Sequence, residues 1–255
     1  MTGFGALIIG DEIMRGKRQD VHFAKLREVF AARGLKLDWV EYHGDDRPHL
    51  IGVFRRTLAS GKVVFSFGGI GATPDDHTRQ AAAGGAGVAL QLHPEAAQLI
   101  HERLTALGRE VSPQQLEMGV FPEGSRIIPN PYNGIPGFSF RHHHFFPGFP
   151  AMAHPMLEWT LDKYYSALFH QHVEAEAAII VWEGVEGVMT PLMQAVEIGF
   201  PGIKVFSLPV LPTAEKRRYV ELGVRGEPAQ VGPALLELQQ GVAALGYSFE
   251  PLISS

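Results

Sequence analysis

A short apolar run that ends in a glycine-rich turn constrains this chain more than any other feature. Residues 63–67 are mostly β-branched or aromatic, as a strand covered on both faces should be. Gly68, Gly69 and Gly71 follow directly. Because glycine adopts positive φ and lets a ligand approach the backbone closely, this turn is suited to cradling a phosphate. The stretch predicts a buried strand, a phosphate-binding turn and the start of a helix.

The residues after the turn favour a ligand site over a plain connection. We expect Thr73 or Asp75 to cap the next helix, with Pro74 in its first turn, and the free N–H groups there would attract an anion. A tight turn with an ordinary helix cap is the alternative. The adjacent carboxylates of Asp75 and Asp76 favour the ligand, because beside a phosphate they would need a divalent cation.

Composition narrows the classes of function. The 255 residues are 45% hydrophobic, enough for one large domain or for one domain and a smaller one. The net charge is 22 − 27 = −5 without a basic run, which gives little reason to expect nucleic-acid binding. The absence of cysteine excludes disulfides, thiolate metal sites and a cysteine nucleophile. The first residues lack the pattern of a signal peptide or membrane span, so we expect a cytoplasmic protein without a membrane partner.

The order of the elements predicts the fold class. Strands are expected at residues 4–9, 35–42 and 63–67, with helices between them, the first capped by Asp20. A β-α-β-α-β-α order predicts a parallel sheet with helices on both faces. Further helices are expected at 94–107 and 150–169.

Acidic residues follow each of the three strands. Open α/β sheets bind ligands at the carboxyl ends of their strands, and neighbouring parallel strands end at one edge. Solvated loops are the alternative, since aspartate is common in loops. The sequence therefore predicts a ligand site at this edge, formed by Asp11 and Glu12, Asp45 and Asp46, and Asp75 and Asp76.

Two other segments call for an interpretation. His142, His143 and His144 suggest a metal site, but adjacent residues of a strand point to opposite faces, so we expect a solvated or hydrogen-bonded strand. After about residue 170, expected strands at 177–182, 203–208 and 218–224 and helices at 187–198 and 228–245 suit a small α+β domain with an antiparallel sheet.

Four motifs, in order, resemble a known family. Residues 10–16, Gly-Asp-Glu-Ile-Met-Arg-Gly, resemble the opening motif of the molybdopterin-binding domain of competence/damage-inducible protein A (CinA) and of eukaryotic FAD synthases. Residues 68–78 are similar to the Gly-Gly-(Leu/Ile)-Gly-Pro-Thr-x-Asp-Asp-x-Thr of that domain. Segments 121–131 and 136–150 resemble two later motifs. The related MogA and MoaB proteins usually have threonine where Ile70 stands, so the chain resembles the CinA branch more closely.

The resemblance implies a domain organisation. We expect a three-layer α/β domain of the MoaB/MogA type at residues 1–170 and a small KH-like α+β domain at residues 171–255. The length leaves no room for the C-terminal amidohydrolase domain of CinA. The Gly-x-x-Gly loop and basic face of KH domains are not evident, so RNA is not an expected partner.

The resemblance also implies an activity, the metal-dependent hydrolysis of ADP-ribose or a related dinucleotide at its pyrophosphate. Asp45 and Asp76 match the two functional aspartates of the MogA-type adenylyl-transfer site and are the expected catalytic residues. Magnesium or a similar ion would be held by Asp45, Asp75 and Asp76. The residues expected to bind the ligand and its phosphates are Gly10, Asp11, Glu12, Gly16, Gly68, Gly69, Ile70, Gly71, Thr73, Thr78, Gly148 and Pro150.

Two alternatives remain open. The fold could bind a pterin or nucleotide without turnover, since fold alone does not establish catalysis. Adenylyl transfer in molybdenum cofactor synthesis is the other alternative, and Ile70 weighs against it. Met152 stands where the CinA branch usually has glutamate, which puts the catalytic interpretation in doubt. The expected partners are a small-molecule ligand and further copies of the chain in a homo-oligomer.

Overall fold

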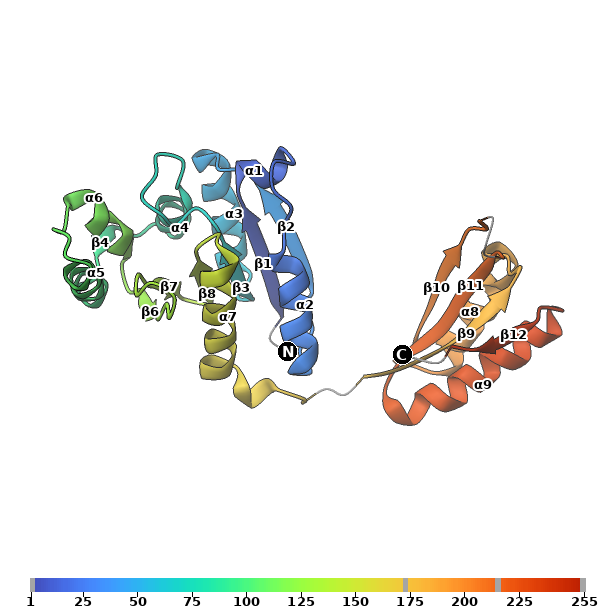
Figure 1. Ribbon diagram of the computed structural model, residues 1–255. Coiled ribbons are helices and arrows are strands. Elements are labelled where there is room, and N and C mark those ends of the chain that lie inside the picture. Colours follow the sequence, from blue (N-terminus) through green and yellow to red (C-terminus); the bar gives the residue numbers. More distant parts are fainter. Residues whose placement is uncertain (1–2, 172–173, 214–216, 253–255) are drawn as a thin grey trace. The chain divides into compact units, whose positions relative to one another are not determined.

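A computed structural model describes residues 3–171, 174–213 and 217–252. The chain forms two compact units, residues 1–170 and residues 171–255. Figure 1 shows their helices and strands. Each unit has its own hydrophobic core, and each is described by itself.

A six-stranded sheet forms the centre of the first unit. Its strand order is β2-β1-β3-β8-β7-β6, and the first four strands are parallel, whereas β7 and β6 run antiparallel to their neighbours. The strands are β1 (Phe4–Ile9), β2 (Trp39–His43), β3 (Val63–Phe67), β6 (Arg126–Ile128), β7 (Gly137–Phe140) and β8 (His143–Phe146). The parallel part agrees with the predicted class, and β1 and β3 have the predicted bounds.

Helices cover both faces of this sheet. Phe4, Ala6 and Ile8 of β1 pack with α2 (His22–Ala32) and α7 (Pro150–Tyr164). Leu7 and Ile9 point to the other face and pack with α3 (Arg47–Ala59), α4 (Thr78–Ala86) and α5 (Pro94–Ala106). The three-layer architecture is thereby confirmed. The shorter elements are α1 (Asp11–Met14), β4 (Leu90–Leu92), α6 (Pro113–Leu116), η1 (Glu117–Gly119), β5 (Val120–Pro122) and η2 (Ser166–Leu168).

Strand β2 begins later than the pattern predicts, at Trp39 rather than at residue 35. The N–H of Leu35 donates to the carbonyl of Phe30 and closes the end of α2. Pairing with β1 starts only where the N–H of Asp38 donates to the carbonyl of Phe4. The alternation of Leu35 and Leu37 is real, but it belongs to an irregular connecting segment that packs both side chains against the core.

The two histidines of β8 confirm the expected hydrogen-bonded strand. His143 Nε2 lies 2.9 Å from Thr57 Oγ1 on one face of the sheet. His144 hydrogen-bonds on the other face with Ser139 Oγ and Tyr165 Oη, both at 2.7 Å. Burial lowers the pKa of each of these two imidazoles to about 3, so both are neutral in the folded chain at neutral pH. They bind no common ion, because they point apart.

The second unit has a four-stranded antiparallel sheet in the order β10-β11-β9-β12. Helices α8 (Glu186–Gly199) and α9 (Pro228–Ala244) pack on it through the second core, as the predicted α+β pattern requires. Its strands are β9 (Ala175–Trp182), β10 (Lys204–Val210), β11 (Tyr219–Gly226) and β12 (Phe249–Pro251), of which the pattern did not predict β12. No helix among the described residues is long and apolar enough to cross a membrane.

The buried histidines predict acid sensitivity. Their pKa is lowered by folding, so their stabilising contribution is present above about pH 6.5 and is lost as the pH falls toward 3, where only the unfolded chain takes up protons. At pH 5 the titration of each imidazole should make the free energy of unfolding of the protein about 2 kcal/mol lower than it is at pH 7.5. We expect His143→Gln to reduce this acid loss. Urea titrations at both pH values measure it.

The matched control is His142→Gln, because His142 lies in the exposed turn beside β8. It should leave the difference between the two pH values unchanged. An equal acid loss in the wild type and in His143→Gln would contradict the assignment of the effect to the buried imidazole.

Candidate functional site

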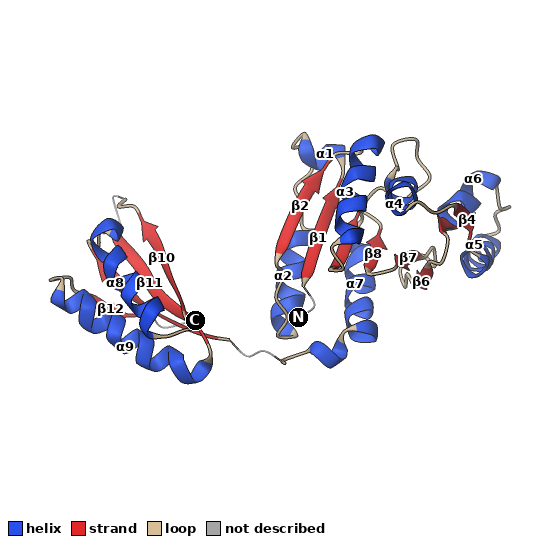
Figure 2. Ribbon diagram, turned by 180° about the vertical axis from the view of Figure 1, so that it is seen from behind, coloured by secondary structure: helices blue, strands red, loops and turns tan. Residues whose placement is uncertain are grey.

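The carboxyl ends of β1 and β2 meet through their acidic residues. The N–H of Asp11 donates to Asp45 Oδ2 at 2.8 Å, and the N–H of Asp45 donates to Asp11 Oδ1 at 3.2 Å. Just before them, the N–H of Gly10 donates to the carbonyl of His43 at 3.0 Å. In Figure 2 the arrowheads of β1 and β2 point to the same end of the sheet, where α1 lies. The prediction that these acidic strand ends share one edge is confirmed.

The glycine turn lies directly beside them at the end of β3. Gly68 has φ 96°, and a Cβ there would lie 2.1 Å from the carbonyl oxygen of Ile9. Gly69 has φ 67°, and its Cβ would lie 2.3 Å from Thr78 Oγ1. A side chain at either position would collide with the end of β1 or with the start of α4. Glycine is required at both positions, because φ is positive and because a Cβ would collide with a neighbouring residue.

Two of the residues expected to touch the ligand support the turn from inside. Thr78 is fully buried, its hydroxyl donates to the carbonyl of Gly68 at 3.0 Å and its N–H donates to the carbonyl of Gly69 at 2.9 Å. Ile70 is 7% exposed and belongs to the hydrophobic core. Their side chains therefore hold the turn in shape, and its accessible part is the half-buried backbone of Gly69 and Gly71.

The predicted cap of the next helix is wrong. Helix α4 begins at Thr78, and residues 73–76 form a separate turn closed by the N–H of Asp76 donating to the carbonyl of Thr73. Pro74 takes the second position of this turn, which its fixed φ favours. The carboxylate of Asp76 accepts from the N–H of Thr73 at 2.8 Å and from its hydroxyl, so it serves this turn and not the helix.

Negative charge accumulates around Asp45. Burial raises the pKa of the Asp45 carboxyl, and the neighbouring charges of Asp11, Glu12 and Asp75 raise it further, against the hydrogen bond from the Asp11 N–H. Glu12 folds back to within 2.8 Å of the position of a Cβ on Gly10. An exposed ion pair with Arg15, at 2.6 Å, partly neutralises Asp11. A cation bound here would relieve the remaining repulsion.

The carboxylates do not form a closed metal cage. Across the ranges that the structure describes, no three His, Asp or Glu side chains are arranged to hold an ion. Magnesium commonly takes only one or two carboxylates and completes its shell with water and ligand phosphates. Asp45 and Asp75, which influence one another electrostatically, fit that open mode and not a preformed three-carboxylate site.

The fourth parallel strand adds Gly148 to the same edge. The N–H of Gly68 donates to the carbonyl of Phe146 at 3.0 Å, and a Cβ on Gly148 would lie 3.5 Å from the Cα of Gly68. The Gly148 carbonyl contacts His22 Nε2 at 3.2 Å. Helix α7 starts two residues later at Pro150. Gly16, by contrast, lies past α1 with nothing within 4 Å of its Cβ position, so only its positive φ calls for glycine.

Three residues near the site were not predicted. His22 is 4% exposed, and its N–H donates to Asp20 at 2.8 Å at the start of α2. This position brings its ring into contact with the carbonyl of Gly148. Arg79 is 3% exposed and donates to the carbonyl of Gly71 at 2.6 Å. Asn133 Nδ2 lies 3.6 Å from Met152 Sδ. A signal existed for Arg79, since it precedes the buried Ala82 and Ala83 by three and four residues on one face of α4.

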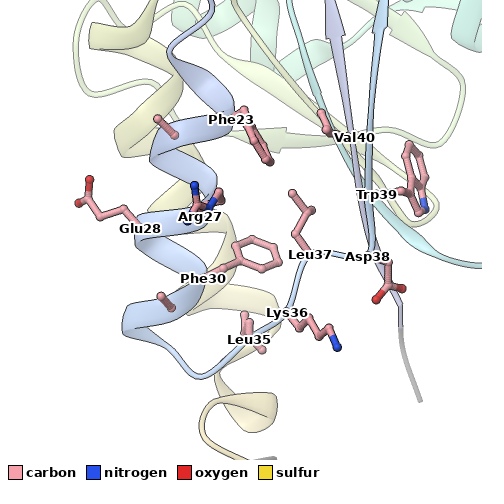
Figure 3. A pocket seen from close by; sticks show the side chains of 12 residues that line it. Phe23, Arg27, Glu28, Phe30, Leu35, Lys36, Leu37, Asp38, Trp39 and Val40 are labelled. Atoms are coloured by element: carbon pink, nitrogen blue, oxygen red, sulfur yellow. The ribbon is translucent and has the colours of Figure 1, made fainter. Parts of the chain in front are cut away.

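A groove of about 770 Å³ lies elsewhere in the first unit. Phe23 and Phe30 of α2 point into it toward Leu37 and Val40, as Figure 3 shows. None of the predicted site residues lines it. The predicted site residues are therefore at the open edge of the sheet and not in this groove.

The known proteins that are similar to this chain match its first unit. A family described as "Probable molybdopterin binding domain" matches residues 5–167. A CinA-like protein of Anaeromyxobacter sp. is 32% identical over 162 residues, which are 62% of this chain and 40% of that protein. A CinA-like protein of Desulforapulum autotrophicum is 34% identical over 164 residues, 61% of this chain and 38% of that protein. The chain thus spans about two fifths of the length of these relatives.

A solved structure is similar as well. The crystal structure of the protein CinA from Thermoplasma acidophilum, described as of unknown function, has 25% sequence identity and a TM-score of 0.56. The match covers 64% of this chain and 98% of that one. The similarity falls on the first unit, which carries the glycine turn and the acidic strand ends.

The contact at Gly68 predicts a steep penalty for any side chain. We expect Gly68→Ala to destabilise the first unit by more than about 3 kcal/mol, since the strain of a positive φ alone is worth roughly 1–3 kcal/mol and the collision with Ile9 adds to it. Gly61→Ala is the control, because Gly61 also has positive φ, 68°, but nothing within 4 Å of its Cβ position. Urea unfolding compares the two. Equal losses would show that the contact contributes nothing.

Proposed function

The chain belongs to the family of probable molybdopterin-binding domains, and from this premise we propose that its first unit binds the diphosphate of a nucleotide or pterin and hydrolyses ADP-ribose or a related dinucleotide. The ligand's phosphates would lie against the backbone of the Gly68–Gly71 turn. The pyrophosphate would face the carboxylates of Asp11, Asp45 and Asp75.

One observation carries this proposal. The acidic ends of β1 and β2, joined by the paired hydrogen bonds of Asp11 and Asp45, lie beside a turn in which only glycine fits. A side-chain-free turn lets phosphate oxygens reach backbone N–H groups. The neighbouring carboxylates repel a phosphate, but they can bind a cation or accept a hydrogen bond from a water molecule that attacks the phosphate.

The chain's own residues would divide the work. Water attacks one phosphorus atom, a new P–O bond forms and the bridging P–O bond breaks, which releases AMP and ribose 5-phosphate from ADP-ribose. Asp45 accepts the proton of the attacking water as general base. Asp76 holds the turn of residues 73–76 through Thr73. A divalent ion held by Asp45 and Asp75 would neutralise phosphate charge and activate water when bound.

A second candidate function has an observation of its own in its favour. Met152 lies in the first turn of α7, four residues after Gly148, and its sulfur contacts the side-chain amide of Asn133. A thioether neither binds magnesium nor orients a water as a carboxylate would. A module that binds the ligand without turnover is therefore the competing function.

Release of AMP from ADP-ribose in the presence of magnesium tests the proposed activity. We expect Asp45→Asn to lower the rate by about 100-fold or more, because a positioned base typically contributes that much. Chromatography of the nucleotide products measures it. Asp162→Asn is the matched control, since this exposed carboxylate pairs with Arg33 at the far end of α7. Equal rates for both variants, or none in the wild type, would rule out the activity as proposed.

Met152 decides between the two candidates. We expect the wild type to be active and Met152→Glu to change its rate by less than about tenfold, because the glutamate would accept a hydrogen bond from Asn133 and serve structure. Asp45→Asn, the variant without the proposed base, serves as the blank for the chromatographic assay. Wild-type turnover no higher than this blank, restored by Met152→Glu, would make the chain a binding module that lacks the chemistry.

A further inference from the structure

Arg79 is an unusual residue to find buried. It lies in the first turn of α4 and is 3% exposed. Arginine is almost never fully buried unless a carboxylate pairs with it. Within the described ranges its guanidinium donates only to backbone carbonyls, those of Gly71, Glu117 and Val120, and its Nε has no partner there.

The charge of Arg79 therefore lacks a direct counter-ion. Among the residues that the structure describes, no carboxylate comes within ion-pair distance of it. Burial lowers the pKa of Arg79, and the more distant charges of Asp76 and Glu117 act against this. Asp76 is itself occupied, since Thr73 donates to it twice. Arg79 is thus a cation that the protein buries without neutralising.

This cation lies against the buried side of the glycine turn. Its Nη2 is 2.6 Å from the carbonyl oxygen of Gly71, the last glycine of the turn. Thr78, the residue before it, holds the turn through the Gly68 and Gly69 carbonyls. The guanidinium thus holds the turn by its Gly71 carbonyl, while the Asp76 carboxylate lies beside the position that a Cβ on Gly71 would take.

The opposite wall of the site is acidic. Asp11, Glu12, Asp45 and Asp75 together disfavour any anion at the edge of the sheet. Electrostatic interactions are stronger in the low dielectric of a protein interior than in water, so a buried cation can offset this repulsion from behind the turn. The offset grows with each negative charge that the ligand brings.

We propose that Arg79 is the specificity-determining cation of this site, and that it makes the glycine turn prefer diphosphates to monophosphates and uncharged nucleosides. The inference rests on the proposed function for the location of the ligand. The competing role is purely structural, a clamp that ties Gly71 to the segment at Glu117 and Val120. A clamp alone would affect all ligands equally, whatever their charge.

Calorimetric titration with adenosine, AMP and ADP, in EDTA to remove divalent ions, separates these roles. We expect the wild type to bind ADP most tightly and adenosine most weakly. Arg79→Gln should weaken ADP by about tenfold or more, AMP by less, and adenosine by less than about twofold. Arg79→Lys keeps the charge and should stay within a few-fold of wild type for ADP. Arg55→Gln removes one exposed positive charge from α3 and is the matched control, expected to leave all three affinities unchanged.

The outcomes are distinguishable. Equal losses for adenosine and ADP in Arg79→Gln would overturn the inference and leave the proposed function standing. Wild-type protein that binds none of the three ligands in EDTA would also overturn the inference, because the buried cation would then not offset the carboxylates, and the AMP-release assay with magnesium decides the proposed function separately. Thermal melts show whether each variant folds, and if only Arg79→Lys folds, its ADP affinity relative to its adenosine affinity decides. If neither folds, the wild-type series decides, since ADP that binds no more tightly than adenosine contradicts the preference.

Discussion

Residue 68 cannot carry a side chain, and the rest of the site depends on this constraint. A Cβ there would lie 2.1 Å from the carbonyl oxygen of Ile9, so β3 ends in immediate contact with the end of β1. The same closeness allows the N–H of Gly68 to donate to Phe146 and brings the Gly148 segment against the turn. Three strand ends thereby form one continuous surface of backbone, and the acidic residues stand around it.

Opposite charges lie on the two sides of this surface. The carboxylates around Asp45 are partly exposed, and burial of Asp45 together with their repulsion raises its pKa. Arg79 is buried behind the turn and meets only carbonyl oxygens. Each arrangement is unfavourable by itself, because like charges repel and a buried cation loses its hydration. A phosphorylated ligand would ease both, since its anion faces the cation and its bound water or metal faces the carboxylates.

The sequence was enough to predict the parallel part of the sheet and the edge at which the acidic strand ends meet. Strands β1 and β3 are short apolar runs with clear ends, and Asp20 accepts from the first N–H groups of α2, although it lies one residue before the N-cap Val21. The start of α4 was misplaced, because Asp76 folds back onto Thr73 and forms a turn of its own before the helix. Local propensity does not distinguish a carboxylate that caps a helix from one that closes a preceding turn.

Residues whose environment comes from distant segments were beyond sequence patterns. Arg79 is buried because residues 117–120, some forty positions later, supply the carbonyls around it. Strand β12 is three residues long and forms only by pairing with β9, some seventy positions earlier. Both depend on long-range contacts that a window of neighbouring residues does not contain. His143 and His144 were predictable in part, because strand alternation alone shows that they point apart.

The strand order of the second unit bears on how the chain folds during synthesis. Strand β9 is the first of that unit to be made, yet it lies between β11 and β12, so its pairing waits for the last described strand. The sheet of the first unit is complete once β8 ends at Phe146, and α7 then covers it by Tyr164. Because domains fold as units in the order of translation, the ligand-binding unit can reach its native state while the apolar strand β9 still lacks both neighbours. Throughout that interval β9 is an apolar strand without its partners, and unpaired strand edges favour mispairing.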